Sequence, residues 1–489
     1  MGDISFFDTG NQIKNLHIVD NEKGLQKVDY KYNVRGWLKS INQDLDSDND
    51  LFNFTLKYND PTIGTGLFNG NISQTSWNTL NTGSSAKTYT YSYDALNRII
   101  GAIDNNGNYN LGGYNSAGNL INPITYDKNG NIKSLQRQGH LDNNINPTFG
   151  IMDNLVYDYG TSKGNKLLKV SDTGIASIGV EGQFQDGNTS GNDYTYDVNG
   201  NMISDLNKGI TNIIYNHLNL PTLVYLGSSG KQIEYTYDAT GVKLQKKVTD
   251  YNAGLYTEYA GNYIYEKYGS GVPSLQFFNH SEGYVKNDNG TFNYIYQYKD
   301  HLGNVRLSYA DTDNDGHIDI EKNGQDLDGD GKIDEYEIVE ESNYYPFGLK
   351  HKGYNNVTSS NGNSVAQKFG FGGKELSEEL GLNTMDFGAR NYDASLGRWF
   401  NIDNKADVIH SISMSPYHYA ANNPIIFIDP DGQDWFYYKG EGDEDASYHW
   451  HEGSEYEHSY SYTDDDGKEQ TKTIDLTGVS SFVANDQND

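Results

Sequence analysis

The stretch Tyr126-Asp127-Lys128-Asn129-Gly130-Asn131-Ile132 decides the fold, because its pattern returns along the chain. A close copy is Tyr196-Asp197-Val198-Asn199-Gly200-Asn201-Met202, and looser copies begin at Tyr32, Tyr93 and Tyr237. Each unit is a strand that ends in Tyr and Asp or Asn, then a turn, then an aliphatic residue. Asp or Asn can hydrogen-bond its own backbone to start a turn, and Gly or Asn accepts a positive φ. The pattern therefore predicts repeated β-hairpins.

The residues before each turn alternate between polar and apolar, as in Ile233-Glu234-Tyr235-Thr236-Tyr237. A period of two marks a strand with one buried face. The tyrosines at 196, 215 and 237 are 19 and 22 residues apart, a spacing that suits one hairpin per repeat. Unrelated hairpins that share Tyr-Asp are the alternative, but the common turn and aliphatic position favour a repeat. We expect little helix, because no long 3.6-residue period occurs before about residue 405.

Composition narrows the classes of function. The 489 residues include 41 tyrosines and 54 glycines, carry a net charge of −31 and contain no cysteine. Such an acidic chain is a poor partner for nucleic acid, and the lack of cysteine excludes disulfides and Cys-type zinc sites. No apolar run reaches the roughly 20 residues that a membrane span requires. The first ten residues show no signal peptide, so we expect a secreted or extracellular protein that is exported by another route, or a piece of a longer chain.

The repeats resemble the YD repeats of the Rhs (rearrangement hotspot) family. A series of further motifs resembles the Rhs repeat-associated core domain, in the order found there. These motifs are Asp300-His301-Leu302-Gly303-Asn304-Val305-Arg306, Asn343-Tyr344-Tyr345-Pro346-Phe347-Gly348, Phe371-Gly372-Gly373-Lys374-Glu375, the stretch from Ala389 to Phe400, the stretch from Pro416 to Pro424, and Asp429-Pro430-Asp431-Gly432.

The resemblance implies an all-β fold, in which a long antiparallel strip of hairpins curves into a spiral or partial shell capped by the core domain. The expected domains are the repeat strip (1–293), the core domain (294–432) and a short acidic, aromatic and variable C-terminal segment (433–489). The implied function is structural, to enclose or present a C-terminal toxin or effector for delivery. The implied partners are the chain's own C-terminal segment or toxin cargo, secretion or injection machinery and an immunity protein. A secreted calcium-dependent adhesin or carbohydrate-binding protein is the alternative.

Two acidic loops within residues 311–337 predict calcium binding, and with it a small calcium-loop insertion in the core domain. The second loop places oxygen ligands at the spacing of an EF-hand, with glycine at its sixth position and glutamate at its twelfth. The first loop repeats the first nine positions, but its twelfth residue is Lys322. A solvated acidic turn is the alternative for each loop. The predicted ligands are Asp326, Asp328, Asp330, Lys332 (through its carbonyl), Asp334 and Glu337 in the second loop, and Asp311, Asp313, Asp315, His317 and Asp319 in the first.

The resemblance also implies a possible self-cleavage site, because related core domains end in an aspartyl autoprotease motif. Asp429 matches the aspartate of that motif, Asp403 is the candidate partner, and Arg398 could orient Asp403. Two carboxylates that share a proton can activate water against a peptide bond. The alternative is that residues 429–432 simply form the turn that closes the core domain. No other arrangement of nucleophile and base suggests an enzyme.

Overall fold

The computed structural model describes most of the chain between residues 25 and 433. The described residues are 25–42, 50–81, 85–144, 146–161, 164–174, 183–227, 230–251, 254–314, 316, 318–320, 336–354, 358–359, 361–404 and 414–433, together with the backbone of strands at 5–7, 11–14, 436–437, 447–450, 457–463, 469–475 and 481–484.

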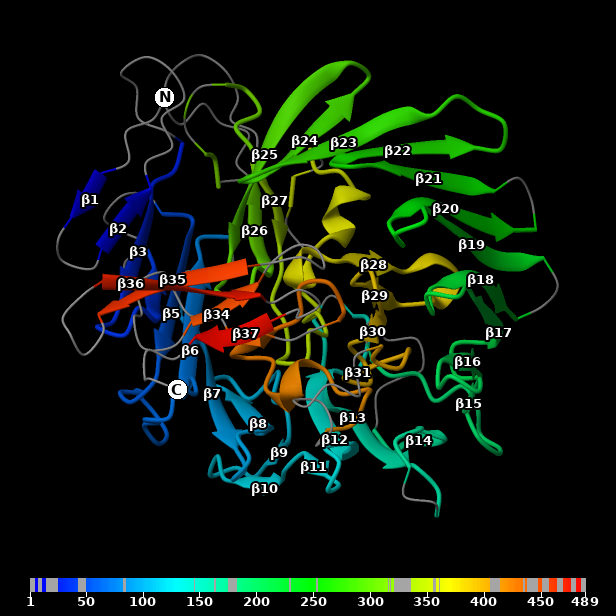
Figure 1. The fold of residues 1–489 in the computed structure, drawn as a ribbon, viewed down its shortest axis with the longest axis horizontal. Coiled ribbons are helices and arrows are strands. Elements are labelled where there is room, and N and C mark those ends of the chain that lie inside the picture. Colours follow the sequence, from blue (N-terminus) through cyan, green and yellow to red (C-terminus); the bar gives the residue numbers. More distant parts are fainter. Residues whose placement is uncertain are drawn as a thin grey trace.

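Antiparallel strands in chain order build most of the fold (Figure 1). The first sheet contains β1 (Ser5–Phe7), β2 (Asn11–Lys14), β3 (Val28–Tyr32), β4 (Leu38–Ile41), β5 (Phe52–Lys57), β6 (Gln74–Thr79), β7 (Lys87–Tyr93) and β8 (Ile99–Asp104). A small pair follows, formed by β9 (Gly113–Tyr114) and β10 (Leu120–Asn122). A four-stranded sheet then contains β11 (Thr125–Tyr126), β12 (Ile132–His140), β13 (Phe149–Asp158) and β14 (Lys169–Asp172).

The largest sheet has 13 strands and is not closed on itself. Its order is β15 (Tyr194–Tyr196), β16 (Met202–Asp205), β17 (Ile210–Tyr215), β18 (Pro221–Leu226), β19 (Lys231–Tyr237), β20 (Lys243–Asp250), β21 (Leu255–Ala260), β22 (Tyr263–Tyr268), β23 (Ser274–His280), β24 (Gly283–Asp288), β25 (Thr291–Lys299), β26 (Val305–Tyr309) and β27 (Ile338–Glu341). The expected domain boundary between residues 293 and 294 lies within β25, and the sheet continues across it to β27.

Backbone contacts join the three main sheets into one strip. Leu111 forms bridges to Ala102 of β8 and to Arg137 of β12, and so connects the first sheet to the second. At the next junction, the backbone nitrogen of Tyr194 in β15 donates to the carbonyl of Leu168, beside β14, at 3.2 Å. The sheets between β1 and β27 are therefore linked by backbone contacts into one strip rather than separate globular modules.

A cap segment, which we define as residues 343–433, follows the strip. It contains three-residue 3₁₀ turns η1 (Ala366–Lys368), η2 (Phe371–Gly373), η3 (Glu379–Gly381) and η4 (Ala420–Asn422), and short strands β28 (Glu375–Ser377), β29 (Thr384–Asp386), β30 (Asn391–Asp393), β31 (Arg398–Trp399) and β32 (Phe427–Ile428). The remaining strands are β33 (Phe436–Tyr437), which pairs with β32, and β34 (Ser447–Trp450), β35 (Glu457–Thr463), β36 (Glu469–Asp475) and β37 (Ser481–Ala484). The all-β prediction is confirmed, and helix among the described residues is confined to η1–η4.

The Tyr-Asp turn closes through the side chain of its Asp or Asn residue. In one repeat, Oδ1 of Asp127 accepts hydrogen bonds from the backbone nitrogens of Asn129 and Asn131, at 2.8 and 2.9 Å. Gly130 adopts φ +80°, a conformation that other residues rarely take, so glycine suits this position. The same pair of side-chain bonds occurs at Asn33, Asp94, Asn115, Asn216, Asp238 and Asp300.

Five tyrosines, which we call the ladder tyrosines, each bond to a carbonyl of the preceding repeat. Tyr126 donates its hydroxyl to the carbonyl of Ile99 at 2.5 Å, and Tyr215 donates to that of Met202 at 2.5 Å. Each acceptor lies five residues after the Asp or Asn of the preceding turn. Tyrosine therefore recurs because its ring fills the buried face while its hydroxyl satisfies a carbonyl. The other three bonds join Tyr58 to Leu38, Tyr159 to Ile132 and Tyr237 to Pro221.

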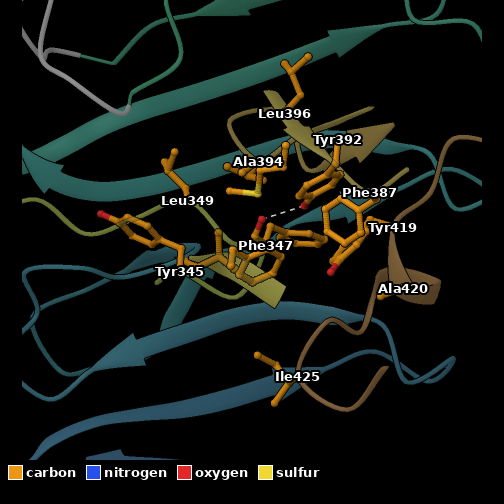
Figure 2. Close-up of a cluster of buried hydrophobic side chains, with 14 of the residues drawn as sticks. Tyr345, Phe347, Leu349, Phe387, Tyr392, Ala394, Leu396, Tyr419, Ala420 and Ile425 are labelled. Atoms are coloured by element: carbon orange, nitrogen blue, oxygen red, sulfur yellow. Dashed lines mark hydrogen bonds between the residues drawn. The ribbon is translucent and has the colours of Figure 1, made fainter. Parts of the chain in front are cut away.

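The cap segment lies within the path of the strip. In Figure 1 the strands pass around the yellow and orange elements of the cap segment, from β5 through β12 to β20. One hydrophobic cluster joins both parts, since it includes Phe52 and Ile233 of the strip and Trp399 of the cap segment, all fully buried. Figure 2 shows Phe347, Phe387, Tyr392 and Tyr419 of this cluster, in which Tyr392 donates to the carbonyl of Phe347 at 2.8 Å.

Polar side chains of the cap segment bind directly to turns of the strip. The contacts use backbone carbonyls that the hairpin ladders leave free, so each one gives a carbonyl of the strip a hydrogen-bond donor from the cap segment. The bonds run from Asn422 Nδ2 to Gly130 O at 2.9 Å, from Asn423 Nδ2 to Asn97 O at 2.8 Å, from Tyr417 Oη to Gly200 O at 2.6 Å, and from Asn401 Nδ2 to Asn219 O at 3.0 Å.

Candidate functional site

Two carboxylates that are distant in the sequence meet on one arginine of the cap segment. Asp403 follows β31, Asp429 follows β32, and Arg390 immediately precedes β30. The guanidinium of Arg390 places Nη1 at 2.9 Å from Oδ2 of Asp403 and Nη2 at 3.0 Å from Oδ2 of Asp429. The face of the same guanidinium lies 4.3 Å from the ring centroid of Trp399, which keeps it in place. The structure thus brings the two predicted aspartates together.

Burial changes the acidity of this pair. Asp429 is only 3% exposed, and this burial raises its pKa to about 7, against the opposing charge of Arg390. Near pH 7, Asp429 is therefore protonated in about half of the molecules, beside the positive charge of Arg390. One protonated and one ionised carboxyl group form the arrangement that general acid–base cleavage of a peptide requires.

The chain at Gly432 is held against the same group. Its backbone nitrogen donates to Oδ1 of Asp429 at 2.7 Å, and its carbonyl oxygen accepts a hydrogen bond from Nε of Arg390. Gly432 has φ +79°, and a Cβ there would lie 2.9 Å from the backbone nitrogen of Arg390, so this position requires glycine. Arg390 thus polarises the carbonyl of the Gly432–Gln433 peptide bond beside a carboxyl pair.

Arg398, which the sequence suggested as the orienting residue, lies elsewhere. Its Nη1 donates to the hydroxyl of Tyr159 at 2.9 Å and its Nη2 to the carbonyl of Asn165 at 3.1 Å. The guanidinium also lies 4.8 Å from the ring centroid of Tyr417. Arg390, rather than Arg398, contacts both carboxylates. No sequence signal singled out Arg390, because a buried arginine cannot be distinguished from an exposed one by its neighbours along the chain.

The acidic loops supply a second cluster. Carboxylate oxygens of Asp311, Asp313 and Glu337 lie within 4.8 Å of one another. Glu337 immediately precedes β27 and is 1% exposed, and its Oε1 accepts a 2.8 Å bond from the hydroxyl of Thr312. Burial raises the pKa of Glu337 to about 7. Three carboxylates, one of them able to bind through both oxygens, offer the hard oxygen ligands that calcium prefers.

Glu337, predicted as the twelfth residue of the second acidic loop, lies next to Asp311 and Asp313 of the first. Oδ2 of Asp311 accepts a 3.2 Å bond from the backbone nitrogen of Gly316, which closes the first loop. The backbone nitrogen of Asp319 donates to Oε2 of Glu337 at 3.1 Å, so this predicted ligand is also adjacent. The predicted ligands Asp315, His317, Asp326, Asp328, Asp330, Lys332 and Asp334 lie outside the described residues.

None of the helices among the described residues has the length and apolar character that a membrane span needs.

Comparisons with known proteins find only distant similarity. No family model matches the chain. The sequence is 25% identical to salivary gland surface protein 1 of Aedes aegypti over 254 residues. This alignment covers 49% of the chain and 6% of that protein. Among solved structures, the crystal structure of TcdB2-TccC3-TEV aligns with 87% of the chain, at 15% identity and a TM-score of 0.49. The Tc holotoxin pore of Photorhabdus luminescens aligns with 84% of the chain, at 14% identity and a TM-score of 0.48.

The chain spans 20% and 19% of the length of these two structures, and a smaller share of the curated relative. At such identities and TM-scores the similarities assign no family, and the fold described above rests on the strands of this chain itself.

Proposed function

We propose that the protein is a secreted structural shell or scaffold that encloses or presents its C-terminal segment, or a toxin or effector cargo attached there, for delivery. The observation that carries this proposal is the single strip of strands that passes around the cap segment, whose asparagines bind the turns of several repeats. A curved sheet of this length can separate one face from solvent by wrapping it around other elements. Secretion or injection machinery and an immunity protein are the partners that this role would need.

Limited proteolysis tests whether the C-terminal segment is enclosed. Trypsin can cut the segment after Lys439, Lys468 and Lys472, and the cuts can be followed by mass spectrometry. In the intact protein we expect these cuts to be about tenfold slower than in the double variant Asn422→Ala/Asn423→Ala, because that variant loses bonds between the cap segment and the turns and opens more often.

The control is Asn59→Ala, at an exposed position, which should behave as the wild type. Equal rates of cutting in all three proteins would contradict enclosure. Binding of the intact protein to polysaccharides, together with equal rates, would instead support the adhesin alternative.

A bound calcium ion would stabilise this scaffold at the junction between β26 and β27. The proposal rests on Asp311, Asp313 and Glu337, which bring the start of the first loop together with the end of the second. Glu337 supplies the carboxylate that Lys322 cannot supply at the twelfth position of the first loop. The ion would reduce the repulsion among the three carboxylates and fix both ends of a long connection in the sheet.

Calcium is therefore expected to raise the melting temperature of the wild type, and EDTA should reverse the effect. At a calcium concentration 100 times the dissociation constant, the gain is about 2.7 kcal/mol in the free energy of unfolding. The variants Asp313→Asn and Glu337→Gln should lose most of this gain, whereas Glu378→Gln, at an exposed position, should retain it. A calcium effect of equal size in Asp313→Asn and the wild type would exclude this site.

Self-cleavage is a second candidate function, and the arrangement around Arg390 favours it. Asp403 and Asp429 share one guanidinium, and the carbonyl of Gly432 is bound to the same residue. Water activated by the ionised carboxylate could attack this carbonyl while the protonated carboxyl group donates to the departing nitrogen of Gln433. Cleavage there would release the segment from residue 433 onward.

Incubation of the purified chain followed by intact-mass measurement tests this activity. We expect two products that meet near residues 432 and 433, and no cleavage in Asp429→Asn. Because the mechanism needs a proton on Asp429, the rate should fall about tenfold per pH unit above pH 7. Asp60→Asn, at an exposed position, is the control and should cleave like the wild type. An intact wild-type chain at every pH would leave residues 429–432 as a closing turn only.

A further inference from the structure

Three histidines lie where the cap segment meets the strip, and each has one ring nitrogen bonded and the other buried without a partner. We propose that this contact, which we call the seal, is acid-sensitive, and that His301, His351 and His418 maintain it only in their neutral form. The inference goes beyond the proposed shell. It concerns the contact itself, and only its use in releasing a cargo rests on the proposed function.

His351 belongs to the cap segment and lies among tyrosines of the strip. Its Nε2 is 2.8 Å from the hydroxyl oxygen of Tyr89, and that hydroxyl donates its own hydrogen to the carbonyl of Tyr109 at 2.5 Å. Nε2 must therefore carry a hydrogen, which leaves Nδ1 as an unprotonated nitrogen. Nδ1 is buried with no hydrogen-bond partner, and the ring stacks on Tyr109 at 4.2 Å and 9°. A second proton would have no acceptor.

His301 makes the reverse connection, from the strip to the cap segment. It lies in the turn between β25 and β26, and its Nε2 is 2.8 Å from the carbonyl oxygen of Ile425. A carbonyl only accepts, so Nε2 carries the hydrogen and Nδ1 is the unprotonated nitrogen. Nδ1 is buried without a partner, and the ring stacks on Phe54 at 5.5 Å and 25°.

His418 completes the set beside the carboxyl pair. Its Nδ1 donates to the carbonyl of Ser415 at 2.5 Å, and its Nε2 is buried without a partner. The backbone nitrogen of Ser415 in turn donates to the carbonyl of Asn129, in a turn of the strip, at 2.6 Å. The backbone of His418 also forms a bridge with that of Arg398. His418 therefore supports the short segment through which the cap contacts that turn.

The charged groups that face these rings oppose a further positive charge. Burial is the main cause that lowers the pKa of His351 well below its usual value, and Arg306, His140 and Lys87 lower it further. The phenols around this ring, on Tyr89, Tyr109, Tyr345 and Tyr354, are neutral, because burial raises the pKa of each of them.

The other two histidines have similar surroundings. Burial lowers the pKa of His418 to about 4, and the charge of Arg390 acts in the same direction. Burial also lowers the pKa of His301, where Arg306 adds to the effect and the negative charge of Asp300 opposes it. None of the three rings has an ion-pair partner among the described residues that would hold it in the charged form.

The sign of the pH dependence follows from the lowered pKa values of the three histidines. A histidine with a lowered pKa in the closed state stabilises that state above about pH 6.5, its value when exposed, and the contribution is lost as the pH falls. Asp205 and Asp429 act in the opposite direction, because burial raises the pKa of both to about 7 and protonation then favours the closed state on acidification. The contribution of the histidines must therefore be measured as the ratio of the opening constant of the wild type to that of a variant without these histidines, because the contributions of the aspartates then cancel.

Hydrogen exchange of backbone amides in the full chain measures the opening of the seal. Three of these amides cross it directly: Ser415 donates to Asn129, Met202 to Phe400 and Val305 to Gly370. After correction for the intrinsic exchange rate, each gives an opening constant at pH 6 and at pH 5. The test variant is His301→Gln/His351→Gln/His418→Asn, in which each amide nitrogen replaces the ring nitrogen that donates. His217→Gln, at an exposed position, is the control.

Between pH 6 and pH 5, the ratio of the wild-type opening constant to that of the triple variant should rise, by about eightfold for each histidine that stays neutral in the closed state over this range. The ratio of wild type to His217→Gln should stay constant. A flat ratio for the triple variant would overturn the proposal.

If the triple variant does not fold, deuterium exchange at the histidine ring C2 position in the wild type decides the question instead. His301, His351 and His418 should exchange slowly and titrate below pH 6.5, the usual value for an exposed histidine. Titration of all three near pH 6.5 would overturn the proposal.

Discussion

Replacement of Arg137 by methionine is expected to destabilise the protein by about 3 to 5 kcal/mol. Arg137, in β12, is fully buried, as is its partner Asp153 in β13, and its Nε lies 2.6 Å from Oδ2 of Asp153. Its two remaining nitrogens donate to the carbonyls of Ala394 and Ser395 in the cap segment, at 3.2 and 2.6 Å. The substitution leaves a buried carboxylate without its cation and two carbonyls without donors, which is the costly way to break a buried ion pair.

Equilibrium unfolding in urea, followed by tryptophan fluorescence, measures this loss. The double variant Arg137→Met/Asp153→Asn should recover part of the stability, because the uncompensated charge is gone while an amide oxygen can still accept the 3.0 Å bond from the backbone nitrogen of Phe184. Arg35→Met, at an exposed position, should change the free energy of unfolding by less than about 0.5 kcal/mol. A double variant as unstable as the single one would show that the lost donors, not the charge, determine the cost.

Asp205→Asn is expected to stabilise the protein by about 2 to 4 kcal/mol at pH 8, with an effect that disappears near pH 4. Asp205 is fully buried at the end of β16, and burial raises its pKa to about 7, helped by the negative charge of Asp393 and opposed by Lys208. Because this value lies above that of an exposed aspartate, the protonated carboxyl group stabilises the fold at low pH. This contribution is lost as the pH rises through 7.

The design of the substitution follows from the contacts of Asp205. Oδ1 accepts bonds from the backbone nitrogens of Asn207 and Lys208, which asparagine can also accept, whereas Oδ2 is buried without a partner. Urea unfolding at pH 4, 5, 6, 7 and 8 gives the profile. Asp197→Asn is the control, because the equivalent turn at Asn216 already uses asparagine. A gain in stability that is constant with pH would contradict ionisation as its cause.

The fold was predictable because the residues that form each turn lie within a few positions of one another along the chain. The turn needs only an Asp or Asn and a residue that accepts positive φ, and the Tyr-Asp-x-Asn-Gly-Asn stretches supply both within a few positions. Alternation before each turn then fixes which face of the strand is buried. The continuity of the strip was a further prediction, and the bridges through Leu111 confirm it for the junction between the first two sheets.

The sites were only partly predictable, because their geometry depends on contacts between distant residues. Sequence motifs pointed to Asp403 and Asp429, but the guanidinium that joins them is that of Arg390 and not Arg398. Spacing predicted Glu337 as a ligand of the second acidic loop, but gave no sign that the sheet also places it next to Asp311 of the first. Pairing between β26 and β27 places Glu337 beside Asp311, and no local sequence pattern encodes this pairing.

The burial of charged residues was also not predictable from the local sequence. Lys246, in β20, is 1% exposed and binds Glu375 at 2.6 Å, although 129 residues separate them along the chain. In the sequence, Lys246 is one of two adjacent lysines on a polar strand and would be expected in solvent. Only the docking of the cap segment against β20 explains why this lysine is buried and paired.

The ladder tyrosines have a consequence for how such a chain can change length during evolution. The hydroxyl of Tyr215 reaches a carbonyl 13 residues earlier, whereas that of Tyr126 reaches one 27 residues earlier, yet both acceptors occupy the same place after a turn. The bond thus tolerates variable connections between neighbours, provided that each new unit brings its own tyrosine and turn. Whole hairpins can then be gained or lost by duplication and deletion without redesign of the rest, whereas a change within the Tyr-Asp turn would disturb two units at once.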